Sequence, residues 1–290
     1  MDLIQAILYG IVQGITEWLP ISSTAHLRVL PALAGWQDPG AGFTAVIQLG
    51  TLLAVLIYFR TELWGAIKGW VGSFRGGEAA KTPEARLGWA VFVGTFPIVI
   101  CGVLFEDQIK GGLRSLWVIA TMLIVVGVFM IVAERLGKQT RELKDVSWRD
   151  GLWVGLWQAV ALIPGSSRSG STMTGAFIAG FDKSTAARFS FLLSVPSIFA
   201  AGIKELYDER AAILGAQLLP TIVATLVSFF VGYASIAWLI GYLRKGSTLG
   251  FVIYRFLLAG LLIFLMQTGR LDPMVGIETP SKTDVSTTTR

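Results

Sequence analysis

Long apolar runs separated by polar segments dominate the hydrophobic pattern of this chain. A membrane-spanning helix takes about 20 predominantly apolar residues, and several runs come close to that length. They lie at about 43–59, 89–105, 116–134, 187–204, 218–243 and 251–266. Residues 60–86 are polar and contain Gly76-Gly77, so we predict a loop between the first two spans. The pattern predicts an all-α, polytopic membrane protein.

Two further apolar segments are broken by proline and small polar residues. The first, 3–36, is interrupted at Pro20, and the second, 151–181, is interrupted at Pro164. Proline ends a helix, and the serines that follow each proline can cap a second one. Neither half is long enough to cross a bilayer alone. We therefore predict that each segment forms a re-entrant helical hairpin, which enters and leaves on one side of the membrane.

The two broken segments also resemble each other in sequence. The pair Gly10 and Gln13 recurs after 145 positions, whereas the pattern Pro-x-Ser-Ser recurs after 144, so the alignment needs one gap. A re-entrant hairpin does not cross the membrane, and each copy is followed by three full spans, an odd number. The second hairpin therefore begins on the opposite side of the membrane from the first, and the two hairpins meet inside it. This predicts two inverted-topology repeats, at about 1–140 and 150–268, in a single integral membrane domain, 1–268. Chance similarity between two broken helices is the alternative.

Composition and charge agree with a membrane setting. The chain of 290 residues is 53% hydrophobic and 15% charged, whereas soluble domains carry charge on about a quarter of their residues. Lys and Arg concentrate in loops 60–86 and 135–149, which by the positive-inside rule face the cytoplasm and place both termini outside. The net charge of +5 bears on this topology and does not indicate a nucleic acid partner. The C-terminal tail, 269–290, is polar and lacks apolar periodicity, so we expect it to be disordered or weakly held.

Several classes of site are excluded by residue counts. The chain has one cysteine, which excludes an intramolecular disulfide. It also has only one histidine, and together these two residues are too few ligands for a zinc site. The first residues lack a basic n-region, so we predict no cleavable signal peptide. The candidate chemistry therefore lies in the polar residues of the two broken segments.

The break in the second hairpin has the composition of an anion site. Residues 164–172 are Pro-Gly-Ser-Ser-Arg-Ser-Gly-Ser-Thr, and an arginine with several hydroxyl groups is costly at membrane depth. A helix N-terminus, these hydroxyls and the planar guanidinium of Arg168 together favour the oxygens of a phosphate. The alternative is an exposed Ser/Gly loop with one solvated arginine.

The first hairpin carries the candidate acid–base chemistry. Gln13 and Glu17 are four residues apart, so they share one face of a helix. Ser22, Ser23 and His26 follow the break closely enough to line the same cavity. A carboxylate within a membrane marks a metal or proton site, or is half of an ion pair.

Two alternatives assign these residues no catalytic role. Glu17 and Arg168 of the second hairpin could form an ion pair that only pins the hairpins together. His26 on its own could be a packing or interfacial residue, whereas beside Glu17 and the serines it is a candidate proton donor or acceptor. The residues themselves leave both alternatives open.

Both motifs resemble those of the undecaprenyl-pyrophosphate phosphatases of the bacitracin-resistance type. Residues 13–26 are similar to that family's (Glu/Gln)-x-x-x-Glu region, and residues 164–172 are similar to its Pro-Gly-x-Ser-Arg-Ser-x-x-Thr signature. The resemblance extends over almost the whole chain, through 189–193 and 254–256. It implies a multi-pass hydrolase of the bacterial inner membrane that removes the terminal phosphate of undecaprenyl diphosphate. This reaction recycles the lipid carrier of cell-wall synthesis and gives bacitracin resistance.

Phosphate binding is predicted mainly at the second hairpin. Arg168 would hold the phosphate oxygens with both arms of its guanidinium. Phosphoryl transfer needs charge stabilisation and an aligned nucleophile more than covalent chemistry from the protein. The hydroxyl groups predicted to add donors to the same phosphate are those of Ser22, Ser167, Ser169 and Thr172.

Catalysis and metal binding are predicted mainly at the first hairpin. Ser23 is the candidate nucleophile, with Ser22 as the second choice, and His26 is the candidate proton carrier. The resemblance implies a divalent metal, Mg²⁺ or Ca²⁺, and Glu17 would ligate it or act as the base. Gln13 is the second metal position, where many members of the family have Glu, so a charge is missing there. A water activated by Glu17 or His26 is the alternative nucleophile, and the sequence does not separate the two mechanisms.

A transporter is the main rival function. Inverted repeats with broken helices are a transporter architecture, so a lipid-phosphate or anion transporter, or a flippase, could use the same site. A purely structural membrane subunit would leave the paired polar motifs unexplained. The sequence leaves open the membrane face of the site, the length of the lipid chain, and whether the protein forms a homodimer.

Overall fold

The computed structural model describes residues 1–215 and 217–274, and the regular structure in these residues is helical. The first half of the chain forms α1 (Leu3–Trp18), α2 (Ser23–Ala34), α3 (Gly40–Tyr58), α4 (Arg60–Ser73), α5 (Pro83–Leu104), α6 (Glu106–Lys110) and α7 (Leu116–Leu136). The second half forms α8 (Trp148–Val160), α9 (Arg168–Ile178), α10 (Lys183–Asp208), α11 (Arg210–Leu214), α12 (Leu218–Leu243) and α13 (Leu249–Gln267). Short 3₁₀ turns are η1 (Gly77–Lys81), η2 (Gly112–Arg114) and η3 (Leu143–Asp145).

The predicted membrane spans are present. The helices α5, α7, α10, α12 and α13 are each long and apolar enough to cross a membrane. The α3 helix passes the same test only together with α4, which follows it after a bend of 80°. These helices coincide with the predicted spans, so the chain is confirmed as an all-α, polytopic membrane protein.

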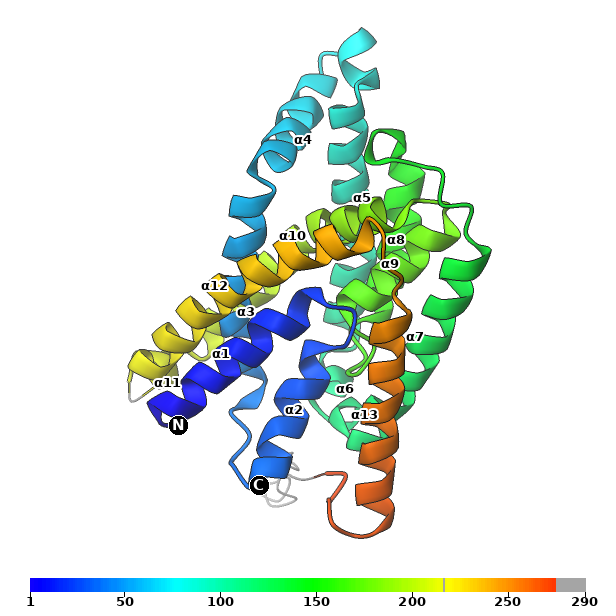
Figure 1. Ribbon diagram of the computed structural model, residues 1–290. Helices are drawn as coiled ribbons and strands as arrows, with labels where there is room; N and C mark the ends of the chain where they lie inside the picture. Colours follow the sequence, from blue (N-terminus) through cyan, green and yellow to red (C-terminus); the bar gives the residue numbers. More distant parts are fainter. Residues whose placement is uncertain (216, 275–290) are drawn as a thin grey trace, which may run out of the picture.

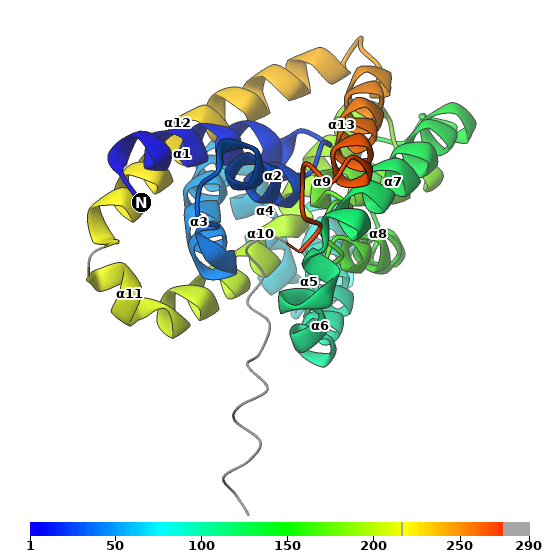
Figure 2. The ribbon, with the colours of Figure 1, turned by 90° about the horizontal axis from the view of Figure 1, so that it is seen from below.

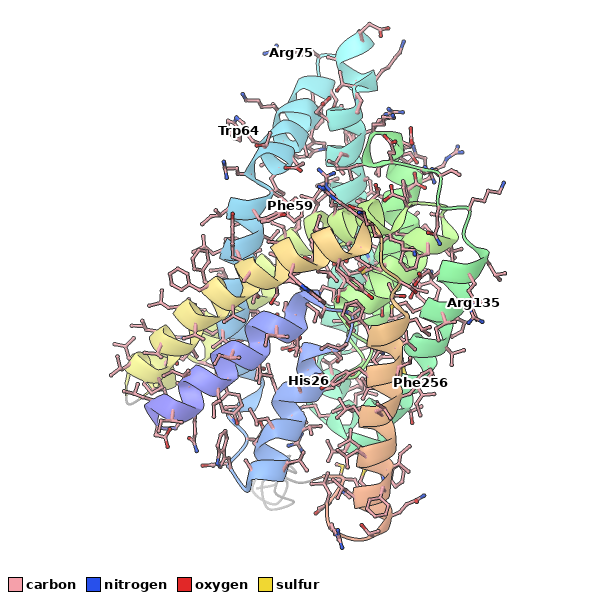
Figure 3. The ribbon with its side chains drawn as sticks, viewed as in Figure 1. His26, Phe59, Trp64, Arg75, Arg135 and Phe256 are labelled. Carbon is pink, nitrogen blue, oxygen red and sulfur yellow. The ribbon has the colours of Figure 1, made fainter. Side chains whose placement is uncertain are left out.

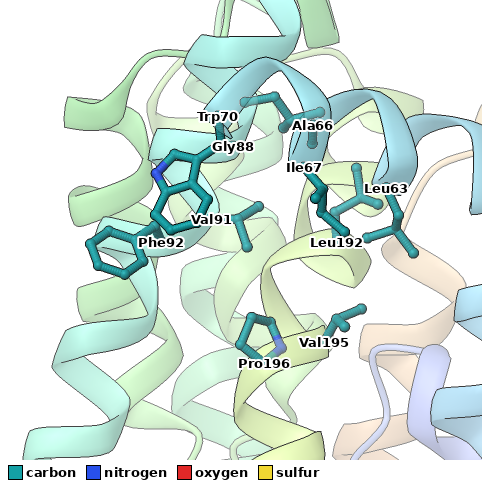
Figure 4. A pocket seen from close by; sticks show the side chains of 11 residues that line it. Leu63, Ala66, Ile67, Trp70, Gly88, Val91, Phe92, Leu192, Val195 and Pro196 are labelled. Carbon is teal, nitrogen blue, oxygen red and sulfur yellow. The ribbon is translucent and has the colours of Figure 1, made fainter. Parts of the chain in front are cut away.

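The loop predicted at 60–86 is wrong in its first half, because α4 is a helix. Its apolar side chains recur with the spacing of one helix face, at Leu63, Ala66, Ile67 and Trp70. This face packs beside α5 and α10 around an apolar pocket of about 200 Å³, which Figure 4 shows from close by. Burial of that face stabilises the helix, and the charged and glycine residues between the apolar positions obscured the period in the sequence.

The two predicted hairpins are present as α1–α2 and α8–α9 (Figure 1). In each, the second helix begins after a serine with a positive φ, 74° at Ser22 and 70° at Ser167. Each serine hydroxyl accepts a hydrogen bond from the backbone N–H three residues later. The two serines are 145 positions apart, the offset that also separates Gly10 from Gly155. The hairpins therefore match without a gap, because equivalent residues are set by the helix caps and not by the prolines.

Each hairpin packs through glycines on a span of the other repeat. The α1 helix lies along α12, where a Cβ atom on Gly10 would lie 2.6 Å from the Ala224 carbonyl oxygen (Figures 1 and 2). The α8 helix lies along α5, where a Cβ atom on Gly155 would lie 2.3 Å from the Gly94 carbonyl oxygen. Small residues allow such close packing of helices in membranes. Because α5 and α12 are the second full spans of their repeats, this reciprocal exchange is the arrangement that an inverted repeat predicts.

The basic loops lie toward one end of the molecule. In Figure 1, the turn between α4 and α5 and the connection between α7 and α8 lie in the upper half, whereas the N-terminus and the end of α13 lie in the lower half. This grouping agrees with the predicted topology. That the loop side faces the cytoplasm stays a prediction, and the polar tail beyond residue 274 lies outside the described residues.

Candidate active site

The two hairpin turns meet inside the protein, as predicted. The Ser169 hydroxyl donates a hydrogen bond to the Leu19 carbonyl oxygen at 3.0 Å, which joins the start of α9 to the end of α1. The second turn also lies against α7. Gly165 has a φ of 94°, and a Cβ atom there would lie 2.5 Å from the Ile119 carbonyl oxygen, so the turn requires glycine.

A buried arginine from α13 holds both turns. Arg255 donates hydrogen bonds to the Pro20 carbonyl oxygen of the first turn at 3.2 Å. It donates to the Gly165 and Ser166 carbonyl oxygens of the second turn at 3.1 and 3.2 Å. Two more hydrogen bonds reach carbonyl oxygens of α7. Because its partners are backbone carbonyls and its side chain is fully buried, Arg255 fixes the shape of the junction between the turns.

The first hairpin brings a carboxylate, an amide and a hydroxyl group together. Glu17 Oε2 accepts hydrogen bonds from Gln13 Nε2 at 3.0 Å and from Ser23 Oγ at 2.7 Å. Gln13 and Glu17 are buried on α1, and Ser23 is half-buried at the start of α2. The break at Pro20 reverses the chain, so the serine at the start of α2 reaches the carboxylate at the end of α1. A serine hydrogen-bonded to a carboxylate is the geometry of a nucleophile with its base.

Arg168 occupies in the second hairpin the position that Ser23 occupies in the first. Each is the first residue of its helix and directly follows the serine with the positive φ. The Nη1 atom of Arg168 is buried and has no hydrogen-bond partner among residues 1–215 and 217–274. No ion pair within the described residues joins Arg168 directly to Glu17. A buried guanidinium in this state is suited to an incoming anion.

The predicted phosphate-binding hydroxyls differ in their surroundings. Ser22 and Ser167 accept hydrogen bonds from the backbone as the N-caps of α2 and α9, and Ser169 Oγ lies 3.1 Å from Ser167 Oγ. These three residues border the junction. Thr172 lies one helical turn further along α9, and its hydroxyl lies 2.5 Å from Ser190 Oγ on α10. The structure therefore brings the serines together and turns Thr172 toward α10.

His26 has a protein partner at each ring nitrogen. Its Nδ1 lies 2.8 Å from the Ser22 carbonyl oxygen, and its Nε2 lies 2.6 Å from the Tyr254 hydroxyl on α13. A carbonyl oxygen only accepts, so in the neutral ring we assign the proton to Nδ1, and Nε2 accepts from the tyrosine. Figure 3 shows His26 between α2 and α13. The histidine thus links the first hairpin to α13.

Oxygen atoms of the first hairpin fit a divalent cation. Gln13 Oε1 is buried without a hydrogen-bond partner in the described part of the chain. Among residues 1–215 and 217–274, both hydrogen bonds to the Glu17 carboxylate use Oε2 and none uses Oε1. The described residues contain no group of three or more His, Cys, Asp or Glu side chains that could hold a metal. Mg²⁺, however, is commonly bound by one or two carboxylates with substrate phosphates and waters, and Gln13 with Glu17 fits that kind of site.

An ion pair outside the membrane-spanning helices fixes the start of the second hairpin. Arg141 donates to both carboxylate oxygens of Asp150 at 2.7 Å, and Ser147 donates to the same carboxylate. Burial alone would raise the pKa of Asp150, but the hydrogen bonds from Arg141 and Ser147 outweigh it and hold that pKa below its ordinary value. The pair lies at the opposite end of α8 from the turn, so it anchors the hairpin without taking part in the site.

The chain matches the model of a known protein family over residues 6–261. The description of that family is "Bacitracin resistance protein BacA", and the match includes both hairpins and every site residue described above. The chain belongs to the BacA family. The resemblance predicted from the two motifs is confirmed.

Relatives of this BacA-family chain carry the name undecaprenyl-diphosphatase. The protein from Chlorobium phaeobacteroides (strain BS1) is 50% identical, with 94% of this chain and 100% of the relative covered. The protein from Myxococcus xanthus (strain DK1622) is 49% identical, with 96% and 94% covered. The protein from Nocardioides sp. (strain ATCC BAA-499 / JS614) is 47% identical, with 93% and 98% covered.

Two contacts of the site were not predicted from the sequence. No role was assigned to Arg255 or to Tyr254, although both lie in the predicted span 251–266. A charged residue within an otherwise apolar span is by itself a signal of function or of a buried polar contact. Arg255 could have been found on that ground, whereas a tyrosine in a membrane helix gives no comparable signal.

Proposed function

We propose that this chain hydrolyses undecaprenyl diphosphate to undecaprenyl phosphate and inorganic phosphate in the inner membrane of a bacterium. The reaction would recycle the lipid carrier of cell-wall synthesis and give bacitracin resistance. Relatives named undecaprenyl-diphosphatase support this proposal. The observation that carries it is the 2.7 Å hydrogen bond from Ser23 to Glu17, at a junction that also holds Arg168 Nη1, a buried donor without a partner among the described residues.

The substrate joins a long apolar chain to a diphosphate, so its head must be bound where the protein also faces lipid. A broad groove between α1 and α12 is lined mainly by apolar side chains and reaches Leu19, next to the first turn. In our proposal the isoprenoid chain lies against this side of the protein while the diphosphate enters the junction. This keeps the apolar chain in lipid and moves the charged head to polar partners.

Arg168 would bind the terminal phosphate. Its guanidinium can donate two parallel hydrogen bonds to phosphate oxygens, and the N-terminus of α9 adds backbone N–H groups and a favourable dipole. The hydroxyls of Ser167 and Ser169 border the same place. We leave Thr172 out of this set because its hydroxyl is engaged with α10. Donors that are already in place before the reaction stabilise the charge of the transition state.

Ser23 would attack the terminal phosphorus. In the first step its proton passes to Glu17, the bond between that phosphorus and the bridging oxygen breaks, and undecaprenyl phosphate leaves. The phosphoryl group then remains on Ser23. In the second step water attacks the phosphorus, the bond to the serine oxygen breaks, and Glu17 returns its proton to Ser23. The two hydrogens of the water leave with the inorganic phosphate.

The neighbours of Ser23 would manage protons and geometry. The Ser22 hydroxyl serves as the N-cap of α2, which favours Ser23 over Ser22 as the nucleophile. His26 would carry protons near the first turn, since its 2.6 Å contact with the Tyr254 hydroxyl is a ready donor and acceptor pair.

A divalent cation, Mg²⁺ or Ca²⁺, would bind to Gln13 Oε1 and Glu17 Oε1. When bound, it would neutralise charge on the diphosphate. The neutral amide of Gln13 contributes no charge, so we expect weaker metal binding than in a site with two carboxylates. No observation in the described residues favours the transporter alternative, whereas the serine–carboxylate pair suits a hydrolase.

The proposal is tested by phosphate release from undecaprenyl diphosphate with the detergent-purified protein, with and without a chelator. Wild type should turn over, and Ser23→Ala and Arg168→Ala should fail while still eluting as folded protein. Arg75→Ala, which removes an exposed arginine far from the junction, is the matched control. Recovery of a phosphorylated Ser23 after acid quenching would support the two-step reaction. Turnover that survives Ser23→Ala would instead favour an activated water, and wild type without any hydrolysis would reject the proposal.

A further inference from the structure

A second group of basic side chains lies outside the catalytic cluster. Arg28 on α2 and Arg114 of η2 each contact Asp38 Oδ2 at 3.1 Å. The side chains of Arg28 and Asp38 are only 3% and 6% exposed. Asp38 Oδ1 also accepts a hydrogen bond from the Gly40 N–H at 3.0 Å, so the carboxylate is fully engaged. The two positive charges therefore share the Asp38 carboxylate, and Asp272 also lies within electrostatic reach of Arg28.

A cavity joins this cluster to the hairpin turns. Its walls include Thr24, which follows the candidate nucleophile directly, and Pro164 of the second turn. Arg28, Arg114 and the Gln48 side chain of α3 line it as well, and its volume is about 30 Å³, so it suits only a small ligand. The hydrophobic neighbours are few, so a small polar ligand would meet donors on several sides. The cavity thus forms a polar extension of the site, away from the α1–α12 groove.

Arg114 is the side chain best placed to bind a ligand there. Its hydrogen bond to Asp38 uses Nη2, and within residues 1–215 and 217–274 its Nε and Nη1 make no other hydrogen bond. The side chain is 16% exposed, so it is desolvated but reachable. The Nε and Nη1 groups can still donate single charge-assisted hydrogen bonds, which a phosphate group accepts.

We propose that this cavity is a phosphate-binding site that receives the inorganic phosphate released by hydrolysis. This inference rests on the proposed function. The lipid product is retained in the membrane by its chain, whereas inorganic phosphate is charged and must leave by a polar route. The cavity supplies that route from the junction toward the side of the molecule that carries the N-terminus. Asp38 offsets part of the positive charge, which keeps the binding weak enough for release.

Opposite substitutions test the site. We expect Arg114→Gln to raise the inhibition constant of inorganic phosphate about tenfold, the size of one charge-assisted hydrogen bond. Asp38→Asn should lower it by a similar factor, because the two arginines lose their shared counter-charge. Arg270→Gln, an exposed arginine toward the same end of the protein, should leave the constant unchanged. If both cluster variants stay within about twofold of wild type, the cavity is not a phosphate site.

Direct binding separates this inference from the proposed function. Inorganic phosphate should raise the unfolding temperature of a Ser23→Ala background, and the rise should shrink with Arg114→Gln and grow with Asp38→Asn, whether or not the wild type is a phosphatase. Lower unfolding temperatures without any change in the phosphate effect would mean that the cluster is only structural. The same unfolding temperatures would also be measured with phosphatidic acid in mixed micelles in place of inorganic phosphate. A response to phosphatidic acid but none to inorganic phosphate would assign the cavity to lipid headgroups and overturn the product site.

Discussion

The two hairpins share one backbone design but place different chemistry on it. In each, a serine with a positive φ caps the second helix, and the next residue lies at the junction. That residue is Ser23 in the first hairpin and Arg168 in the second. A single duplicated position thus supplies the candidate nucleophile from one repeat and the candidate phosphate ligand from the other. Strained backbone of this kind often occurs at functional sites.

The hairpins differ more in their surroundings than in their turns. Residues 169–177 of α9 are all buried, and α9 packs against α7, α8 and α10. The α2 helix packs mainly on α1, and it exposes Thr24 and Leu33. Polar contacts of His26 and Arg28, together with apolar residues that pack with α7 and α13, hold it to the rest of the protein. We infer that the second hairpin is the rigid half of the site and the first is the half that carries out the proton chemistry.

The largest effect should come from the position that distinguishes the hairpins. We expect Ser23→Ala to lower kcat at least about 10³-fold, because it removes the proposed nucleophile. Ser22→Ala should cost about tenfold or less, since it removes a helix cap next to the site. Phosphate release at saturating substrate measures both. A greater loss in Ser22→Ala than in Ser23→Ala would exchange the two roles.

The second hairpin is probed by a substitution that keeps its charge. Arg168→Lys should lower kcat/KM about 10²-fold, because lysine cannot donate two parallel hydrogen bonds to phosphate. The measurement is a substrate titration at fixed detergent and lipid. Near wild-type activity in this variant would show that only a point charge is needed there, and that the rigid placement of the guanidinium is irrelevant.

The contact that joins the hairpins should matter for stability as well as for activity. Arg255→Met leaves carbonyl oxygens of both turns unpaired in a buried place, so we expect a loss of about 3 kcal/mol in the free energy of unfolding. Thermal unfolding in detergent measures this. Arg244→Met, at an exposed position after α12, serves as the control. Equal stability of the two variants would mean that the turns hold their shape without Arg255.

The smallest effect concerns the anchor of the second hairpin and depends on pH. The pKa of Asp150 is lower in the folded protein than in the unfolded chain, so its stabilising effect is present above about pH 4 and is lost as the pH falls through the folded pKa. We expect Asp150→Asn to be less stable than wild type by about 1 kcal/mol at pH 6. The difference should shrink toward pH 3. A difference that stays constant over this range would exclude the carboxylate as its source.

Much of the fold followed from the apolar pattern. Long apolar runs gave the spans, because a membrane leaves little choice of structure to such runs. The breaks at Pro20 and Pro164, each followed by serines, predicted the two hairpins. The spacing of Gln13 and Glu17 predicted that both side chains share one helix face. The helix α4 was missed, because its apolar face is short and interrupted by charges, and the short helices α6 and α11 were not predicted either.

The rest of the site depends on contacts that no local pattern encodes. The predicted alignment of the two repeats was wrong by one residue at the turn, because it matched the prolines. The capping serines are the equivalent residues, and the spacing from proline to cap differs between the two copies. Arg255 and Tyr254 reach the turns from α13, more than 200 residues after Pro20. Asp38 and its two arginines come from three separate segments. Such contacts arise only when the helices pack.

A double-mutant cycle on Ser23 and Arg168 tests most directly whether the two hairpins form one active site. The rate constants of wild type, Ser23→Ala, Arg168→Ala and the double variant would be measured for hydrolysis of undecaprenyl diphosphate under one condition. If both residues act on the same phosphate, the double variant should be about as slow as the slower single variant, because catalytic groups that act as a unit are not additive. Losses that multiply in the double variant would contradict a shared site and place the two hairpins in separate steps.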